Sequence, residues 1–383
     1  MAKLPLDLLT SRHFSGVAAG AIALALLSAC AGPELLPAGA VGSIEYAEPS
    51  RPIVYPPAPA AARFIHEATI IGSTDVVPET GSDRFREFAT GYGRKTEAFG
   101  KPFGLVARHG RLYVSDTVRR LVHVLDRASG EYRQIGTEEP GRLSKPLGLA
   151  VDDSGRVYVC DSTTRRVLVY GSGGEYLTAV GGGEHLKRPS SVAVTPDGSR
   201  IYVLDTGGVD NKQHRIVVFD AEGRRVSVIG TRGAADGQFN LPLSLDRGPN
   251  GDLYVVDAGN FRVQTLSAGG APLSSFGKPG RYPGQFAHPK DVALDASGNI
   301  YVTDSMFGVF QIFSPSGRIL LSVGERNEQG GRGRFLLPAG IDVDVDGRVY
   351  VADQYFRKIE VFRPADLPAS SVPGARIAGV AGK

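Results

Sequence analysis

The sequence predicts an all-β fold, a six-bladed β-propeller whose blades are four-stranded antiparallel sheets. A repeat, a strand pattern and a composition lead to this prediction. The tetrapeptide Tyr-Val-x-Asp occurs six times, at intervals of 45, 44, 52, 47 and 49 residues. The 50 glycines and 25 prolines among 383 residues disfavour a helical bundle and suit many turns. A four-stranded unit repeated at this period is typical of a propeller blade, and six such blades close a ring. The repeated aspartates are Asp116, Asp161, Asp205, Asp257, Asp304 and Asp353.

The net charge argues against one class of partner. The chain carries 43 basic and 40 acidic residues, a formal charge of +3. Dedicated nucleic-acid binders instead show a clustered excess of Lys and Arg. We therefore expect no nucleic-acid partner.

The first 29 residues have the pattern of an export signal. Lys3 and Arg12 precede an apolar run over residues 17–27, which is too short for a permanent membrane span. The run ends in Leu27-Ser28-Ala29-Cys30, which resembles the lipobox of bacterial lipoproteins. The resemblance implies lipid attachment at Cys30, and Ala31 after it implies delivery to the outer membrane. The alternative is an ordinary secretory signal in which the cysteine occurs by chance.

Residues 30–62 are rich in Pro and Ala, which favours an extended tether over a packed element. The propeller is then expected over 63–383. Cys160 is the second of two cysteines and lies in an apolar strand pattern, so we expect a buried, inert thiol and no disulfide.

Each repeat follows the same frame, clearest over residues 145–181. Strands are predicted at 147–151, 156–161, 166–170 and 176–180, with hairpin turns at Ser154-Gly155 and Gly173-Gly174 and a closing Gly181. The last blade lacks a fourth strand. Residues 63–72 match that strand and its closing glycine, so we predict that they complete blade 6 by pairing with its third strand. Residues 376–380 are the alternative.

The frame resembles the NHL-repeat family of six-bladed propellers. The resemblance is clearest from Pro338-Ala339-Gly340-Ile341-Asp342-Val343-Asp344 through Phe362. It implies the fold over residues 63–363, but it says little about function, because members bind RNA or proteins, act as sensors or catalyse amidation. Residues 305–313 are most similar to exported members that accompany multihaem cytochrome systems, which implies an electron-transfer context.

An enzymatic function needs a constellation that the sequence does not provide. In lyase relatives zinc is held by His directly after the blade-opening Pro, whereas this chain has no His there. Calcium-dependent lactonases need several inward acidic or amide side chains, and the first strands offer only Asp291 and Asp342. We therefore expect no catalytic residue, no metal and no cofactor. The residues that follow the prolines are Phe103, Leu147, Ser190, Leu243, Lys290 and Ala339.

Basic residues recur near the start of the third strands. We expect Arg120, Arg166, Arg215, Arg262 and Lys358 to open those strands and to pair with a repeat aspartate or a backbone carbonyl. The arginines directly before three of these positions are less constrained by the repeat and are candidates for a surface role, as are the arginines of the loop at 325–335. Phe239, Phe286 and Phe335 are expected to plug the blade tops. The surface candidates are Arg119, Arg165, Arg357, Arg326, Arg332 and Arg334.

The loops between second and third strands of the last two blades carry Met306, Phe307, Tyr355 and Phe356, where other copies are small or polar. An exposed apolar patch would mark a docking site, and burial of these side chains against each other is the alternative. The sequence thus predicts a lipid-anchored, monomeric, non-catalytic propeller that binds a protein of the cell envelope. A lactonase or lyase and a glycan-binding module are the alternatives.

Overall fold

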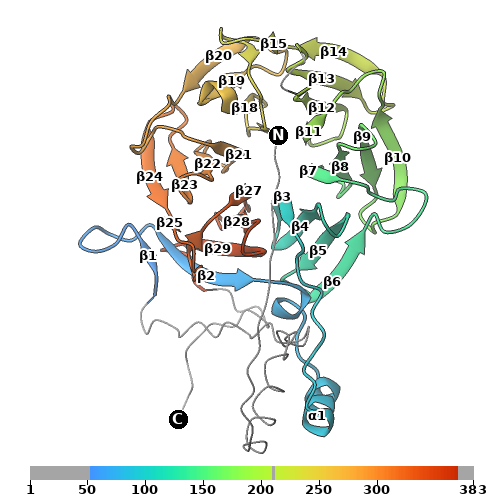
Figure 1. Cartoon of the computed structure of the whole chain (residues 1–383), viewed down its shortest axis with the longest axis vertical. Coiled ribbons are helices and arrows are strands. Elements are labelled where there is room, and N and C mark those ends of the chain that lie inside the picture. Colours follow the sequence, from blue (N-terminus) through green and yellow to red (C-terminus); the bar gives the residue numbers. More distant parts are fainter. Residues whose placement is uncertain (1–51, 209–211, 370–383) are drawn as a thin grey trace, which may run out of the picture. The chain divides into compact units, whose positions relative to one another are not determined.

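The computed structural model describes residues 52–208 and 212–369, and this part of the chain forms a six-bladed β-propeller (Figure 1). Five blades are four-stranded antiparallel sheets with strands in sequence order from the axis outward, and the sixth has a composite sheet. The predicted signal, Cys30 and the alternative closing strand at 376–380 lie outside the described residues. Within them, no helix has the length and apolar character that a membrane span requires.

The first three blades follow one another along the chain. Blade 1 is β3 (Pro102–Arg108), β4 (Arg111–Asp116), β5 (Leu121–Asp126) and β6 (Glu131–Ile135). Blade 2 is β7 (Pro146–Val151), β8 (Val157–Asp161), β9 (Arg166–Tyr170) and β10 (Tyr176–Gly181). Blade 3 is β11 (Pro189–Val194), β12 (Arg200–Asp205), β13 (Arg215–Asp220) and β14 (Arg225–Ile229). The strands predicted for blade 2 agree with β7 to β10 to within one residue at each end.

The next two blades repeat this arrangement. Blade 4 is β17 (Ser244–Arg247), β18 (Leu253–Asp257), β19 (Arg262–Leu266) and β20 (Pro272–Phe276), and its second and third strands are joined by the short helix η2 (Ala258–Asn260). Blade 5 is β21 (Pro289–Leu294), β22 (Ile300–Asp304), β23 (Val309–Phe313) and β24 (Ile319–Val323). Two loops that enter a blade contain short parallel pairs, β15 (Thr231–Arg232) with β16 (Gln238–Phe239) and β25 (Glu325–Arg326) with β26 (Arg334–Phe335).

Blade 6 joins the two ends of the ring, as predicted. Its sheet has the order β1-β2-β29-β28-β27, with β27 (Pro338–Val343), β28 (Val349–Asp353) and β29 (Lys358–Pro364) from the end of the chain. The fourth strand is β2 (Phe64–Ile70), which pairs antiparallel with β29, with Ile70 opposite Ile359. The last part of the predicted tether also packs here, because β1 (Val54–Tyr55) pairs with β2 and the Tyr55 ring contacts Phe362.

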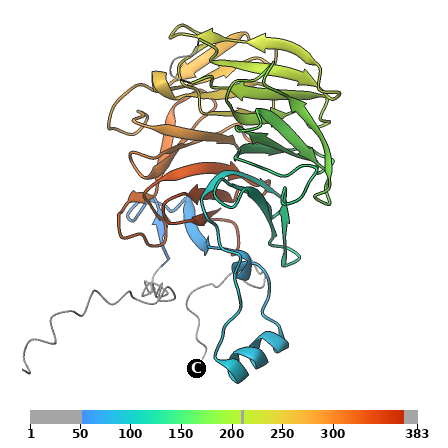
Figure 2. The same ribbon diagram turned by 45° about the vertical axis from the view of Figure 1, so that its right-hand side comes forward.

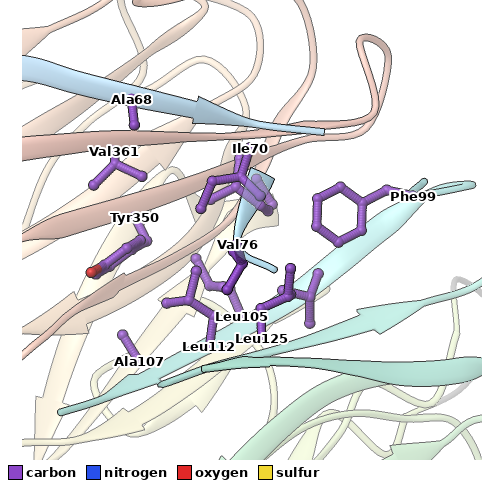
Figure 3. Packing of buried hydrophobic residues seen from close by; sticks show 13 residues of the cluster. Ala68, Ile70, Val76, Phe99, Leu105, Ala107, Leu112, Leu125, Tyr350 and Val361 are labelled. Atoms are coloured by element: carbon purple, nitrogen blue, oxygen red, sulfur yellow. The ribbon is translucent and has the colours of Figure 1, made fainter. Parts of the chain in front are cut away.

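The core lies between the blades, and the junction of blades 6 and 1 shows how the closing strand enters it. Ala68 and Ile70 of β2 pack with Tyr350 and Val361 of blade 6 and with Leu112 of blade 1 (Figure 3). A bulge between His66 and Ala68 changes the face of β2, so Ala68 and Ile70 face this core, whereas Phe64 packs in the core between blades 5 and 6. The N-terminal strand is therefore part of the hydrophobic core rather than an accessory edge.

The closing glycines make room for the predicted phenylalanine plugs. Phe239, Phe286 and Phe335 are fully buried. A Cβ added to Gly324 would lie 2.7 Å from the ring of Phe335, and Gly324 has φ of 102°, a conformation that favours glycine. The equivalent glycines Gly230 and Gly277 face the other two rings in the same way. These phenylalanines are core residues.

The segment 73–101, which joins β2 to β3, is not wholly irregular. It contains a short helix η1 (Ser73–Asp75) and the helix α1 (Gly81–Thr90). Thr80 and Asp83 form a capping box at the start of α1, and Gly91 ends it with φ of 70°. Both views show α1 standing clear of the blades, beyond β6 (Figures 1 and 2).

Candidate functional site

The loops that join second to third strands are organised around the repeat aspartates, and all six aspartates are fully buried. In blade 6, Asp353 Oδ1 accepts hydrogen bonds from the N–H groups of Tyr355 and Phe356, at 2.8 and 3.0 Å. Its Oδ2 accepts from Leu336 at 2.8 Å and from Leu337 at 3.2 Å, in the loop that enters the blade. Asp116, Asp161 and Asp304 accept the equivalent bonds, so in these four blades the repeat aspartate ties two loops of one face together.

The protonation state of Asp116 shows that such a carboxylate is structural. Burial disfavours its charged form, but hydrogen bonds from His123 and from the N–H groups of Arg119, Gly100 and Lys101 outweigh this and lower its pKa to about 2. A carboxylate that stays ionised and fully hydrogen-bonded is not available as a general base near neutral pH.

The second residue after each repeat aspartate points away from this network. In four blades its N–H donates to the aspartate, so the backbone is the same, at Val118, Thr163, Met306 and Tyr355. Val118, Met306 and Tyr355 are 63%, 56% and 56% exposed. Blades 2, 3 and 4 have Thr163, Gly207 and Gly259 at this position.

The three apolar side chains belong to consecutive blades of the ring. Blade 5 contacts blade 6 through β21 and β27, and blade 6 contacts blade 1 through β27 and β3. Leu337, in the loop that enters blade 6, is also 41% exposed. We call Val118, Met306, Leu337 and Tyr355 the apolar face. The sequence predicted this face in blades 5 and 6, through Met306 and Tyr355, but not Val118 in blade 1. Val118 lies two residues after Asp116, as Met306 and Tyr355 lie two residues after their aspartates, and this shared position could have indicated it.

The four predicted apolar candidates divide into two kinds. Met306 and Tyr355 are exposed, whereas Phe307 and Phe356 are half-buried. The ring of Phe356 contacts Tyr355 edge-on at 5.1 Å between centroids and lies 5.2 Å from the Lys358 ammonium. Phe356 therefore supports its loop, and Met306 and Tyr355 present the surface.

Of the three arginines predicted to lie directly before third strands, one has a different position in the structure. Arg165 and Arg357 are exposed and occupy the left-handed region at the fourth position after their aspartates, with φ of 56° and 55°. In blade 1 that position is Arg120, with φ of 59°, and Leu121 opens the third strand. Arg119 is exposed but lies one residue earlier in the turn than Arg165 and Arg357 do in theirs, because the third strand of blade 1 begins one residue later than predicted.

The cations of the third strands and of the loop at 325–335 are largely committed to the fold. Arg215 pairs with Asp205 at 3.3 Å, Arg262 with Asp257 at 2.9 Å, and Lys358 donates to the Gly331 carbonyl at 2.6 Å, as predicted. Lys358 also contacts Glu360. Arg326 Nη1 donates to the carbonyls of Ser305, Met306 and Leu336 and so braces the loops below the apolar face. Arg334 is exposed and lies 3.4 Å from Glu325, and Arg332 is half-buried.

The axial channel is a second place where polar side chains meet. It is lined by first-strand residues of all six blades and has a volume of about 60 Å³. Asp246, Asp291 and Asp342 face it together with Arg108. Asp246 is a residue that sequence reasoning did not select, although it occupies the same frame position as Asp342, four residues after the blade-opening proline.

Two of these carboxylates connect neighbouring blades. Asp342 accepts hydrogen bonds from Ala107 N at 2.7 Å and from Arg108 at 3.3 Å, both in blade 1. Asp291 accepts from Ile341 N in blade 6 at 2.9 Å and from the Ser244 hydroxyl in blade 4. Within the described residues, Asp246 accepts a hydrogen bond from the N–H group of the next residue, Arg247, and none from another blade.

The electrostatics of the channel follow from this crowding. Burial, and then repulsion by Asp342, raise the pKa of Asp246 to about 7. Burial raises the pKa of Asp291 to about 6 against its hydrogen bonds, and burial also raises the pKa of Asp342. Within residues 52–208 and 212–369 no group of three His, Cys, Asp or Glu side chains is arranged to hold a metal ion. Asp291 and Asp342 thus connect blades, and the three carboxylates are not arranged as a metal centre.

A wider hollow of about 640 Å³ lies at the outer edge of blade 1, beside the segment that carries α1. Its cations have partners within the fold: Arg111 pairs with Asp126 at 2.7 Å, Arg94 donates to the Val77 carbonyl and Arg133 to that of Ser172. Nothing in its lining selects a ligand.

The comparisons with known proteins agree with this architecture. The NHL repeat family model matches residues 143–170, which span most of blade 2. Three solved structures match with TM-scores of 0.50 to 0.54: a streptogramin B lyase, a gluconolactonase from Xanthomonas campestris and an auxiliary nutrient binding protein from Bacteroides thetaiotaomicron. They are 15%, 16% and 15% identical to this chain, cover 70% of it in each case, and are themselves covered to 94%, 86% and 70%. At this identity the similarity shows the fold alone.

Proposed function

We propose that this six-bladed propeller with an NHL repeat is a binding module that holds a protein partner on the face of blades 5, 6 and 1, and that it does so from a lipid anchor in the cell envelope. The observation that carries the proposal is the exposure of Val118, Met306 and Tyr355 at one frame position of three consecutive blades. The remaining blades have small or polar residues there.

The physical basis is the cost of leaving such side chains in water. Each apolar side chain gains about 1.5 to 3 kcal/mol when it is fully buried, and a patch on a rigid loop frame loses little conformational entropy on binding. The repeat aspartates supply that rigidity, because the N–H groups of Met306 and Tyr355 are held by buried carboxylates. Exposed Arg357 and Arg119 beside the apolar face suit a partner with acidic groups at its rim.

The anchor in this proposal rests on the Leu-Ser-Ala-Cys pattern at residues 27–30. Lipid at Cys30, with an outer-membrane location, would keep the module and a membrane-associated partner in the same compartment. Mass spectrometry of the protein purified from membranes tests the modification directly.

The partner-binding part is tested by site-specific photo-crosslinking in membranes. A photoreactive amino acid replaces Tyr355 in one variant and Thr163, at the matching position of blade 2, in the control. The proposal expects a discrete protein adduct from position 355, its loss when Met306→Ser is added, and no adduct from position 163. Equal adducts from both positions, or none from either, would contradict the proposal.

An enzymatic function is the second candidate, and the raised pKa values of Asp246 and Asp291 are the observation in its favour. The channel volume of about 60 Å³ argues against it, because ligand pockets typically enclose about 300 to 1,000 Å³. Metal analysis of the purified full chain separates the two, since one ion bound per chain would favour the lactonase or lyase alternative.

A further inference from the structure

The helix α1 has an aromatic surface that nothing in the propeller covers. None of its residues is buried, and Phe85 and Phe88 are 71% and 90% exposed. Tyr92, just after the helix, is 79% exposed. A helix of ten residues without tertiary packing is marginal in water, since isolated helices shorter than about 12 to 15 residues rarely form. A surface that received the aromatic side chains would stabilise the helix.

The arrangement of charges around α1 indicates what kind of surface this is. At about 100° per residue, Phe85 and Phe88 share one side of the helix and exposed Arg84 lies beside them. The two acidic residues, Asp83 and Glu87, fall on the opposite side, and Arg86 is turned toward that side, where it pairs with Asp83. Aromatic residues beside an exposed arginine, with the carboxylates turned away, are typical of helices that lie in the headgroup region of an anionic membrane.

The charge of the whole segment is consistent with this placement. Residues 81–95 contain four cations and two carboxylates, a net charge of +2. Asp83 pairs with Arg86 at 3.1 Å and with Arg94 at 3.6 Å, and Lys95, which is 89% exposed, lies 3.4 Å from Glu97. At 1.5 Å per residue the helix is about 15 Å long, half the hydrocarbon thickness, so it can lie on a bilayer but cannot cross one.

The position of α1 along the chain brings it to the anchored side of the molecule. The described chain starts at Pro52, 22 residues after Cys30, a reach of roughly 70 Å if extended. It enters blade 6 through β1, which pairs with β2, and β2 leads within eleven residues to α1. A lipid on Cys30 would therefore hold this rim of the propeller near the membrane.

We propose that α1 is a second membrane contact, in which Phe85, Phe88 and Tyr92 insert into the interface of an anionic bilayer while Arg84 binds lipid headgroups. The proposal uses the predicted anchor only for proximity. Two contacts, the lipid and α1, would restrict the rotation of the propeller on its tether and so set the direction in which the apolar face points.

The chain contains no tryptophan, so one introduced residue reports on this contact without background. Phe88→Trp places the probe on α1, and Val226→Trp, at an exposed position of blade 3, is the control. The full chain is incorporated into vesicles of phosphatidylethanolamine and phosphatidylglycerol, with and without brominated acyl chains. The expected result is a blue-shifted emission that brominated lipid quenches for Phe88→Trp and not for Val226→Trp. Adding Arg84→Glu should weaken the quenching.

Emission of Phe88→Trp that stays at the wavelength of an exposed indole, and is unaffected by brominated lipid, overturns the proposal and leaves a protein as the partner of this helix. If mass spectrometry finds no lipid on Cys30, flotation of the full chain with the same vesicles replaces the insertion assay. Flotation that is lost in Phe85→Ser/Phe88→Ser then supports the contact, and no flotation overturns it, so failure of the anchor and failure of α1 are distinguished.

Discussion

His66 and Glu360 meet across the closure of the ring, with His66 Nε2 2.5 Å from Glu360 Oε2, although 294 residues separate them in the chain. His66 lies on β2 and Glu360 on β29, and both side chains are fully buried. Thr69 donates its hydroxyl hydrogen to the same carboxylate at 2.7 Å, and Lys358 contacts its other oxygen. The join between the two ends of the propeller thus combines a buried polar cluster with apolar packing, because the His66 ring also contacts Phe362 at 5.5 Å between centroids.

Removing the charge of Glu360 should destabilise the ring strongly. Glu360→Gln leaves the Lys358 ammonium buried without its carboxylate, which typically costs about 3 to 5 kcal/mol. Urea unfolding measures the loss. Glu325→Gln, whose side chain is 63% exposed, is the matched control and should change stability by less than about 0.5 kcal/mol. Equal effects of the two variants would mean that the buried cluster does not stabilise the closure.

The same cluster predicts a dependence on acid. Burial raises the pKa of Glu360, but the bonds from His66 and the charge of Lys358 outweigh it and lower the pKa below its usual 4.5. A lowered pKa means stability that is present above pH 4.5 and is lost as the pH falls through the folded value. Wild-type stability should therefore fall below this pH more steeply than that of Glu360→Gln, as unfolding at several acidic pH values will show.

The axial channel predicts the opposite trend at higher pH. The pKa of Asp246 is raised to about 7, so its favourable contribution is complete below its unfolded value of 3.8 and is lost as the pH rises through 7. Asp246→Asn should match wild type near pH 4 and exceed it near pH 8 by on the order of 1 kcal/mol. Thermal unfolding at the two pH values measures this. Asp153→Asn, in an exposed turn, is the control, and its stability relative to wild type should be the same at both pH values.

Removing the carboxylate of a repeat aspartate should lower the free energy of unfolding far more than removing a neighbouring loop side chain does. Asp161→Ala removes the acceptor of the N–H groups of Ser144, Lys145, Thr163 and Thr164, and each unsatisfied donor costs about 1 kcal/mol or more. We expect a loss of about 3 kcal/mol or more in unfolding experiments. A loss below about 1 kcal/mol would mean that water replaces the carboxylate and that the loop frame is less rigid than proposed.

The apolar face makes a prediction that separates surface from support. Tyr355→Ser should change stability by less than about 0.5 kcal/mol, because Tyr355 is more than half exposed. Phe356→Ala should cost about 1 kcal/mol or more, since it removes the ring that packs on Tyr355 and Lys358. Thermal unfolding of the two variants tests this, and a larger loss in Tyr355→Ser would return that residue to the core.

The repeat made most of the fold predictable. Tyr-Val-x-Asp and the turn glycines recur at one period, so strands, hairpins and the closing role of β2 follow from local patterns that six copies confirm. The helix α1 was missed because it occurs once and replaces a connecting loop, although Thr80, Asp83 and Gly91 are readable capping signals. The extra packing of Tyr55 was missed because a Pro-rich segment has no strand pattern of its own.

The sequence by itself determined the blade, its number of copies and the strand that closes the ring, since each of these depends on residues near one another in the chain or on a repeated motif. Only the tertiary structure decided which side chains are available. It separated exposed Tyr355 from half-buried Phe356, added Val118 to Met306 across the closure, and turned Asp291 and Asp342 into links between blades. Exposure and hydrogen bonding depend on neighbours from other blades, and the chain order does not state which neighbours those are.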